Sequence, residues 1–282
     1  MILVLASTMD VAGMNIIEQL RSICSFEETN KTFDESIVRH TVISGKKVEL
    51  ALTTRDTIYA SHITESFSPE LVICASRHSS ESKLPVLTVH VPGNLNKAEF
   101  GGKDRRVSIA PAYEMKSALK RLLAAKIELG LKEYRVSYEA THHGPSLDIP
   151  VMYVEIGSTA ERWQNKKAGL AAAKAIISSI NPPRKGLRAI GVGGGHYAPK
   201  FTKLGLNTEV AVGHIIPKHA TIYINEEMLK QAIEKTADGA EMLIFDWKGV
   251  KGKERIRITE MAGNMQVDVG KASDFASKYP SS

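Results

Sequence analysis

The chain has 282 residues, of which 43% are hydrophobic and 24% are charged. This balance is typical of a globular protein and excludes a disordered or collagen-like chain. Lysine and arginine number 37 against 31 for aspartate and glutamate, and the net charge of +6 favours partners that carry phosphate. A chain of this length can bury one large core or two smaller ones, so we expect one or two domains.

Cysteine content and hydropathy limit where the protein works. Cys24 and Cys74 form no C-x-x-C pair, so the sequence indicates neither a disulfide framework nor a thiolate zinc site. The apolar residues 2–6 are followed at once by polar residues and lack the basic start of a signal peptide. No stretch of sequence is long and apolar enough for a membrane span. We therefore expect a cytoplasmic protein without membrane contact.

Short apolar segments along the chain have the character of buried strands. In chain order they are residues 2–6, 48–52, 71–75, 86–91, 135–138, 151–156, 188–192, 210–212 and 241–245. Helical periodicity lies between several of them, at about residues 10–23, 112–129, 159–180 and 226–236. This alternation predicts an α/β fold of the three-layer α/β/α type, in which helices cover both faces of a mixed, mostly parallel sheet.

Polar residues predict where three of these helices begin. Asp10 can cap the first helix and Asn225 the fourth, while Ser158 and Glu161 form an S-x-x-E capping box before the third.

Polar stretches also indicate the domain organisation. We expect a small N-terminal α/β lobe over residues 1–65 and a main α/β catalytic domain over residues 66–282, although the strands of the lobe can also continue the main sheet. The segment 92–108 is long, basic and rich in glycine, which is typical of a functional loop.

The placement of the nine histidines is the most informative feature of the sequence. Those that end or follow a predicted strand are His78, His90, His142, His143, His196 and His214. The carboxyl ends of strands line the ligand crevice of an open α/β sheet, so side chains from distant parts of the chain can meet there. The pattern G-H-x-x-P-K occurs at residues 195–200 and again at 213–218, each time after an apolar strand. One such histidine alone indicates a hydrogen-bonded loop residue, but the set predicts a shared site.

Zinc suits such a site, because imidazole and carboxylate are its usual ligands and a catalytic zinc keeps one position for water. Glu155 is the expected carboxylate ligand, since it lies on the strand face opposite the apolar residues and a buried carboxylate needs a partner. His142 and His143 would point to opposite sides of an extended chain, so we expect only His142 to face the metal. Glu139 is the alternative ligand or the general base.

Other chemistries are less well supported. The glycine-rich residues 191–195 lack the last glycine and the following helix of a dinucleotide fingerprint, so no nucleotide cofactor is expected. The serines around His78 belong to no G-x-S-x-G elbow, which disfavours a serine nucleophile.

Several histidine-bearing strings are distinctive as a set. They are C-A-S-R-H-S-S at residues 74–80, T-V-H-V-P-G-N at 88–94, Y-E-A-T-H-H-G-P at 138–145, V-E-I-G-S at 154–158, the segments 191–200 and 213–218, and D-W-K-G at 246–249. In these strings the chain resembles the archaeal and plant D-aminoacyl-tRNA deacylase family, over about residues 7–249. The resemblance implies a zinc-dependent esterase that removes a broad range of D-amino acids from tRNA. It also implies a fold similar to those of peptidyl-tRNA hydrolases and phosphorylase-like hydrolases.

The expected site follows from the histidine pattern and from this resemblance together. The expected zinc ligands are His142, Glu155 and His196, with His78, His90 or His214 at a second ion. The expected catalytic residues are Glu139, as proton acceptor, with His142 and His196. Basic side chains are expected to contact phosphates of the tRNA acceptor end, namely Lys97, Lys103, Lys200 and Lys218.

Other functions stay open at this point. The same residues would serve a zinc-dependent peptidase or amidohydrolase on a similar fold, or a metal-free reaction in which histidine is the base. A tRNA-binding protein without enzymatic activity is a further possibility. We expect a monomer in each case.

Overall fold

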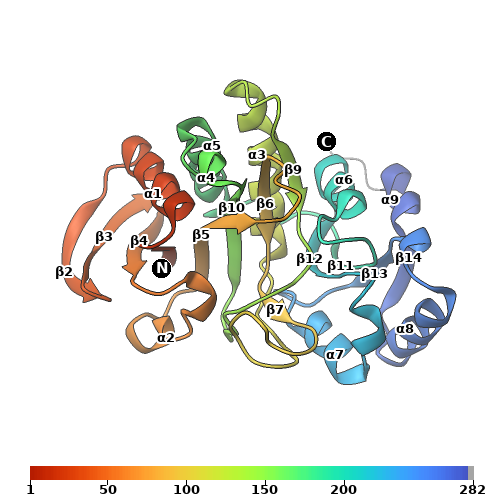
Figure 1. Ribbon diagram of the computed structural model, residues 1–282. Helices are drawn as coiled ribbons and strands as arrows, with labels where there is room; N and C mark the ends of the chain where they lie inside the picture. The colour runs from red at the N-terminus through yellow and green to blue at the C-terminus, as the bar shows by residue number, and fades with distance from the viewer. Residues whose placement is uncertain (279–282) are drawn as a thin grey trace.

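A large sheet forms the N-terminal part of the computed structural model, which describes residues 1–278 (Figure 1). Its strand order is β2 (Glu27–Phe33), β3 (Ser36–Ile43), β4 (Lys46–Thr53), β1 (Ile2–Ser7), β5 (Leu71–Ser79), β10 (Val151–Ser158), β6 (Val86–His90) and β9 (Arg135–Tyr138). The neighbouring strands β4, β1, β5 and β10 run parallel to one another, and β6 runs parallel to β9. The pairings of β2 with β3, of β3 with β4 and of β10 with β6 are antiparallel. The predicted α/β class with a mixed, mostly parallel sheet is confirmed.

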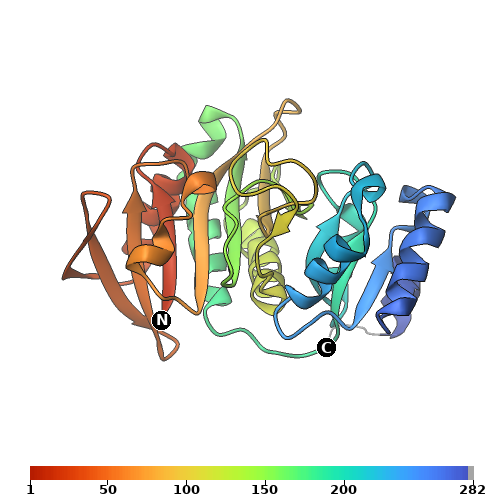
Figure 2. The ribbon, with the colours of Figure 1, turned by 90° about the horizontal axis from the view of Figure 1, so that it is seen from below.

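A second sheet lies beside the first (Figure 2). It contains β12 (Ala211–Ile216), β11 (Arg188–Val192), β13 (Met242–Phe245) and β14 (Asp268–Lys271), all parallel. The sequence predicted one sheet, because apolar periodicity does not encode which strands pair. A short ladder of β7 (Gly93–Asn94) and β8 (Arg106–Val107) closes the loop of residues 92–108.

The chain after β9 joins the carboxyl ends of the two sheets. The backbone N–H of Ala140 donates to the carbonyl of His196 (2.8 Å), and that of Thr141 donates to the carbonyl of Ile215 (2.9 Å). The end of β12 and the segment that follows β11 are thereby held against the residues that follow β9.

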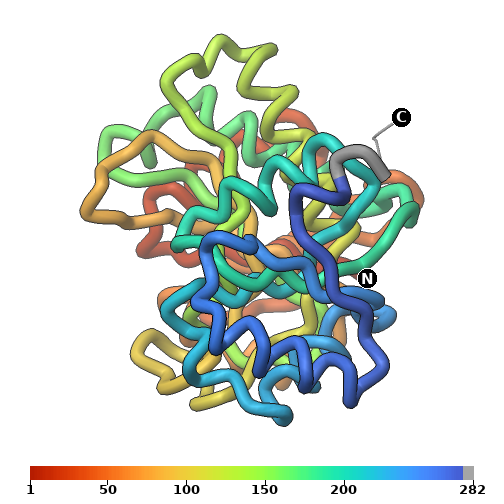
Figure 3. Tube along the Cα trace, turned by 90° about the vertical axis from the view of Figure 1, so that its right-hand side faces the viewer, coloured from red at the N-terminus to blue at the C-terminus, as the bar shows by residue number. Residues whose placement is uncertain are grey.

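Helices cover both sides of the sheets, which confirms the three layers (Figure 1). One side carries α1 (Val11–Ile23), α3 (Ala112–Glu128), α4 (Ala160–Trp163), α5 (Lys166–Ser179), α6 (Pro199–Asn207) and α9 (Ala272–Lys278). The other carries α2 (Ile63–Ser66), α7 (Glu226–Glu234) and α8 (Gly252–Asn264). The short 3₁₀ helices are η1 (Thr57–Tyr59), η2 (Thr221–Tyr223) and η3 (Trp247–Gly249). Figure 3 shows the last strands and helices in front of the rest. None of the helices described is long and apolar enough to cross a membrane.

The strands of residues 1–65 continue the main sheet. β1 pairs in parallel with β5, from Ile2 opposite Leu71 onward, which is the arrangement that the sequence left open. The polar residues from 27 onward form β2 and lead into β3, an edge hairpin that the sequence did not predict. Most of β2 is exposed, so it lacks the apolar pattern of a buried strand.

Two of the predicted helix caps are confirmed. The Asp10 carboxylate accepts hydrogen bonds from the N–H groups of Ala12 and Gly13 at the start of α1. The Asn225 side chain accepts one from the N–H of Met228 at the start of α7.

The predicted capping box of the third helix is wrong. The Ser158 hydroxyl donates instead to the carbonyl of Leu84. The single helix expected over residues 159–180 is two helices, α4 and α5, and the side chain of Asn165 caps the second by accepting from the N–H of Ala168.

Helix α1 approaches β5 so closely that Gly13 has no room for a side chain. An added Cβ would lie 2.7 Å from the carbonyl oxygen of Ala75. Since the backbone of a central strand cannot move aside, we expect Gly13→Ala to lower the free energy of unfolding by about 1–3 kcal/mol. An added Cβ at Gly263 of α8 would meet no atom of the described residues within 4 Å. Gly263→Ala should therefore raise the free energy of unfolding by about 0.5–1 kcal/mol. Urea unfolding followed by circular dichroism measures both, and changes of the same sign would contradict this packing.

Candidate active site

A cavity of about 920 Å³ opens at the carboxyl ends of the strands, near the meeting point of the two sheets. Its wall includes the end of β5, Glu155 of β10, the loop of residues 92–108, and residues that follow β9, β11 and β12. This is the place where an open α/β sheet binds ligands. The volume lies at the upper end of the range of about 300–1,000 Å³ that is usual for small-molecule sites.

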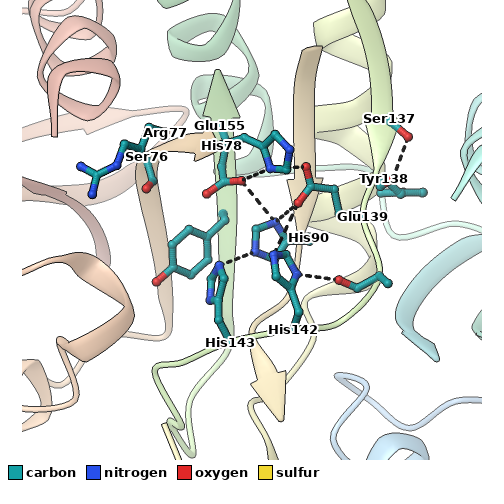
Figure 4. Close-up of polar contacts among 12 residues, drawn as sticks. Ser76, Arg77, His78, His90, Ser137, Tyr138, Glu139, His142, His143 and Glu155 are labelled. Atoms are coloured by element: carbon teal, nitrogen blue, oxygen red, sulfur yellow. Dashed lines mark hydrogen bonds and ion pairs between the residues drawn. The ribbon is translucent and has the colours of Figure 1, made fainter. Parts of the chain in front are cut away.

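Imidazole and carboxylate side chains converge at the inner end of this cavity, five of them in its wall and two, His90 and Glu139, fully buried against those five; Figure 4 shows the cluster without His196. They are His78, His90, His142, His143, His196, Glu139 and Glu155. The ring centroids lie 4.4 Å apart for His90 and His142, 4.7 Å for His142 and His196, and 5.3 Å for His78 and His196. The convergence that the histidine pattern predicted is therefore present in the structure.

Sheet pairing brings these residues together from separate strands. His78 lies opposite Gly157, where β5 runs beside β10. An added Cβ at Gly157 would lie 2.8 Å from the His78 ring, so this glycine makes room for the imidazole. His90, the last residue of β6, lies opposite Tyr153 of β10, and the two rings are stacked with centroids 5.0 Å apart.

Glu139 lies at the centre of the cluster. Its Oε1 is 3.0 Å from Nδ1 of His78, while Oε2 is 3.5 Å from Nδ1 of His90 and 3.3 Å from Nε2 of His196. Burial alone would raise the pKa of Glu139, but its contacts with His196 and His78 outweigh this and hold that pKa well below its usual range. Glu139 is therefore a buried anion surrounded by imidazoles.

Several buried atoms of the cluster lack a well-formed hydrogen bond. Among the described residues, neither carboxylate oxygen of Glu139 has such a partner, and neither does Nδ1 of His90. Buried polar atoms usually have partners, and the exceptions concentrate where an ion or a function completes the arrangement.

Glu155 differs from Glu139 in its access to the cavity. Glu155 belongs to the cavity wall, whereas the side chain of Glu139 is fully covered. Burial, together with the nearby negative charge of Glu139, raises the pKa of Glu155. Burial would lower the pKa of His78, but its contacts with both carboxylates outweigh this and raise it to about 11. A proton is therefore held where these three side chains meet.

His142 and His143 are anchored so that one nitrogen of each ring is free to act as a ligand. Nδ1 of His142 donates to the carbonyl of Ala140 (2.8 Å), and Nδ1 of His143 donates to the carbonyl of Gly144 (2.6 Å). Each Nε2 then carries a lone pair. Burial lowers the pKa values of His90 and His142 well below their usual range and that of His143 to about 4. Neutral, carbonyl-anchored imidazole is the form in which histidine binds metals.

The prediction that His143 points away from His142 is wrong. His143 has a φ of 45°, so the chain is not extended there and side chains do not alternate. The two rings lie 4.3 Å apart, and Nε2 of His143 is 3.2 Å from Nε2 of His90. The Gly144-Pro145 pair, which is typical of a turn, was the signal that could have indicated this.

His214 does not join the cluster, which corrects its prediction as a ligand. It lies inside β12, where its Nδ1 is 3.2 Å from the hydroxyl of Thr141. That hydroxyl also accepts from the N–H of Ile215. Within residues 1–278, His214 belongs to none of the groups that could share an ion. Its contact with Thr141 instead supports the connection between the two sheets.

The four predicted substrate-binding lysines have different surroundings. Lys97 lies in the cavity wall. Lys200 is half exposed and forms an ion pair with Asp246, and its contact with a phosphate stays a prediction. Lys103 and Lys218 are exposed on neighbouring loops, outside the described wall of the cavity.

Comparisons with known proteins agree with this geometry. The sequence model of the D-aminoacyl-tRNA deacylase family matches residues 65–270, which include the whole cluster. A D-aminoacyl-tRNA deacylase of Pyrococcus furiosus is 38% identical over 272 residues, covering 94% of this chain and 97% of the relative. The chain belongs to the D-aminoacyl-tRNA deacylase family. A family member from Thermococcus onnurineus is 41% identical over 262 residues, covering 89% of this chain and 93% of its own. The resemblance seen in the motifs is therefore confirmed.

A solved structure has the same fold. The crystal structure of a conserved protein of unknown function superposes with a TM-score of 0.90 and 31% identity, covering 100% of this chain and 99% of the other. The architecture described above is therefore shared along the full length of that protein.

Proposed function

We propose that the chain hydrolyses the ester between a D-amino acid and tRNA, and that the reaction takes place in the cavity described above. The observation that carries this proposal is the convergence of imidazole and carboxylate groups at the inner end of that cavity. The ester is an activated acyl group, so its hydrolysis needs a placed water, a proton acceptor and stabilisation of the charge that develops on the carbonyl oxygen. Family membership supports the choice of substrate.

The residues present fit zinc. The first set is His90, His142 and His143, whose ligand nitrogens lie within 4.8 Å of one another and whose pKa values keep them neutral. His78, Glu139 and His196 form a second set, which would hold a second ion in place of the proton that both carboxylates keep on His78. A second ion would also give a partner to the orphaned carboxylate oxygens of Glu139. When bound, zinc polarises the ester carbonyl as a Lewis acid and lowers the pKa of water toward about 7.

For the two carboxylates we propose roles different from those expected from the sequence. Glu155 would accept the proton from the attacking water, because its carboxyl group reaches the cavity. Glu139 is enclosed by His78, His90 and His196, so it would position these imidazoles and act as a ligand. Nδ1 of His90 faces Glu139, an arrangement that orients a ligand histidine and raises its basicity.

Deacylation of matched substrates tests the proposed reaction. We expect the purified chain to hydrolyse D-tyrosyl-tRNA and to hydrolyse L-tyrosyl-tRNA much more slowly, because we propose that the shape of the cavity near the α-carbon selects the D hand. Release of labelled tyrosine measures both rates. Tight binding of tRNA without any hydrolysis would indicate a binding protein, and cleavage of peptides instead of esters would indicate a peptidase.

Lys97 should make the tRNA affinity depend on salt. If it contacts one phosphate, Lys97→Gln should weaken binding and reduce the slope of log K against log[salt] by about 0.7–0.9. Lys167→Gln, a charge removal at an exposed position of α5, is the matched control and should leave the slope unchanged. Filter binding of uncharged tRNA at several salt concentrations measures both slopes, and equal slopes would contradict a contact by Lys97.

A further inference from the structure

Exposed aromatic side chains surround the mouth of the cavity. Tyr59, Phe100 and Tyr223 all belong to its wall, and they are 51%, 63% and 43% exposed. Among the described residues, these three side chains form no ring contact and no hydrogen bond with the histidine and glutamate cluster. Grouped exposed apolar side chains usually mark a binding surface.

The backbone holds the segments that carry two of these rings against each other. Gly101 has a φ of +69°, and an added Cβ there would collide with the carbonyl oxygen of Ile58. This glycine therefore packs the loop of residues 92–108 directly against η1, which carries Tyr59. The carbonyl of Phe100 accepts from the N–H of Gly144 (2.9 Å), which ties the same loop to the turn of the histidine pair.

The third ring is tied to the same loop. Arg105 donates from Nη1 to the carbonyl of Tyr223 (3.3 Å) and from Nη2 to the side chain of Asn225 (2.6 Å). η2 and the loop of residues 92–108 therefore form one connected rim. Lys97 of this loop adds a positive charge to the cavity wall.

We propose that Tyr59, Phe100 and Tyr223 form a stacking rim, which binds the unpaired bases of the single-stranded tRNA end next to the ester. This inference rests on the proposed function. Since the ester must reach the histidine cluster at the inner end of the cavity, the nucleotide that carries it and those adjoining it must pass the mouth. Single strands are bound by aromatic side chains, on which bases stack, combined with positive charges that contact the backbone. Stacking tolerates any base, which suits an enzyme that acts on many tRNAs.

The kinetics of D-alanyl-tRNA test the rim, because the alanyl methyl group is too small to stack on it. Phe100→Ala and Tyr223→Ala should each raise KM about 10-fold or more and leave kcat within about twofold, as expected for lost stacking of one base. Phe100→Trp should restore KM, since indole also stacks. Ile127→Ala, at an exposed position of α3 remote from the described cavity wall, is the control for removing an exposed apolar side chain.

A binding measurement separates failure of the rim from failure of the proposed reaction. Uncharged tRNA with 2-aminopurine as its terminal base should lose fluorescence on binding the unaltered chain, and much less on binding Phe100→Ala. Unchanged KM and unchanged quenching in both alanine variants would overturn the proposal. An effect that appears with D-tyrosyl-tRNA but not with D-alanyl-tRNA would also overturn it, because the rim would then contact the amino acid. Absence of hydrolysis by the unaltered chain, with quenching retained, would refute the reaction and not the rim.

Discussion

Removal of the proposed zinc from the purified chain should reduce deacylation of D-aminoacyl-tRNA by about 10³-fold or more. Stabilisation of a developing oxyanion by a Lewis acid is worth several kcal/mol, and each 1.36 kcal/mol corresponds to a tenfold change in rate. Dialysis against a chelator, elemental analysis and re-addition of zinc measure the loss and its reversal. Full activity of metal-free protein would instead support a reaction in which histidine acts as the base without an ion.

Ligand variants test the proposed position of the metal within the cluster. His142→Ala and His143→Ala should each lower the bound zinc and the activity together, because both imidazoles present an unprotonated Nε2. His40→Ala, at a half-exposed position of β3, is the matched control and should change neither quantity. If His142→Ala loses its zinc whereas His143→Ala keeps both zinc and activity, only His142 faces the ion, as the sequence suggested.

The Glu155→Gln variant should lower kcat by about 10²–10⁴-fold while keeping its zinc, since loss of a general base has an effect of this size. The amide preserves the shape of the side chain but cannot accept the proton. Single-turnover deacylation, with elemental analysis of the same sample, separates the chemical step from metal binding.

Glu139→Gln is the companion variant. Glu139 contacts four imidazoles and lies outside the cavity wall, so its amide variant should lose bound zinc first and activity as a consequence. If Glu139→Gln keeps its zinc and loses kcat whereas Glu155→Gln stays active, Glu139 is the base, as the sequence alone suggested.

Local features of the sequence determined the elements of this protein and the residue types of its site. Apolar runs such as residues 2–6 and 71–75 predict strands because a strand that is buried on both faces is apolar on both faces. Asp10 and Asn225 predict helix starts because their side chains satisfy backbone N–H groups that a helix leaves free. The order of the histidine-bearing motifs was enough to indicate the family.

Only the tertiary structure decided which side chains meet. His143 enters the cluster through one left-handed backbone angle, and His214 stays outside it because its strand turns that ring toward Thr141. The pairing of the chain after β9 with residues of β12 and the segment after β11 brings His196 to Glu139. Such contacts join residues far apart in sequence and depend on strand pairing and register, which local periodicity does not encode.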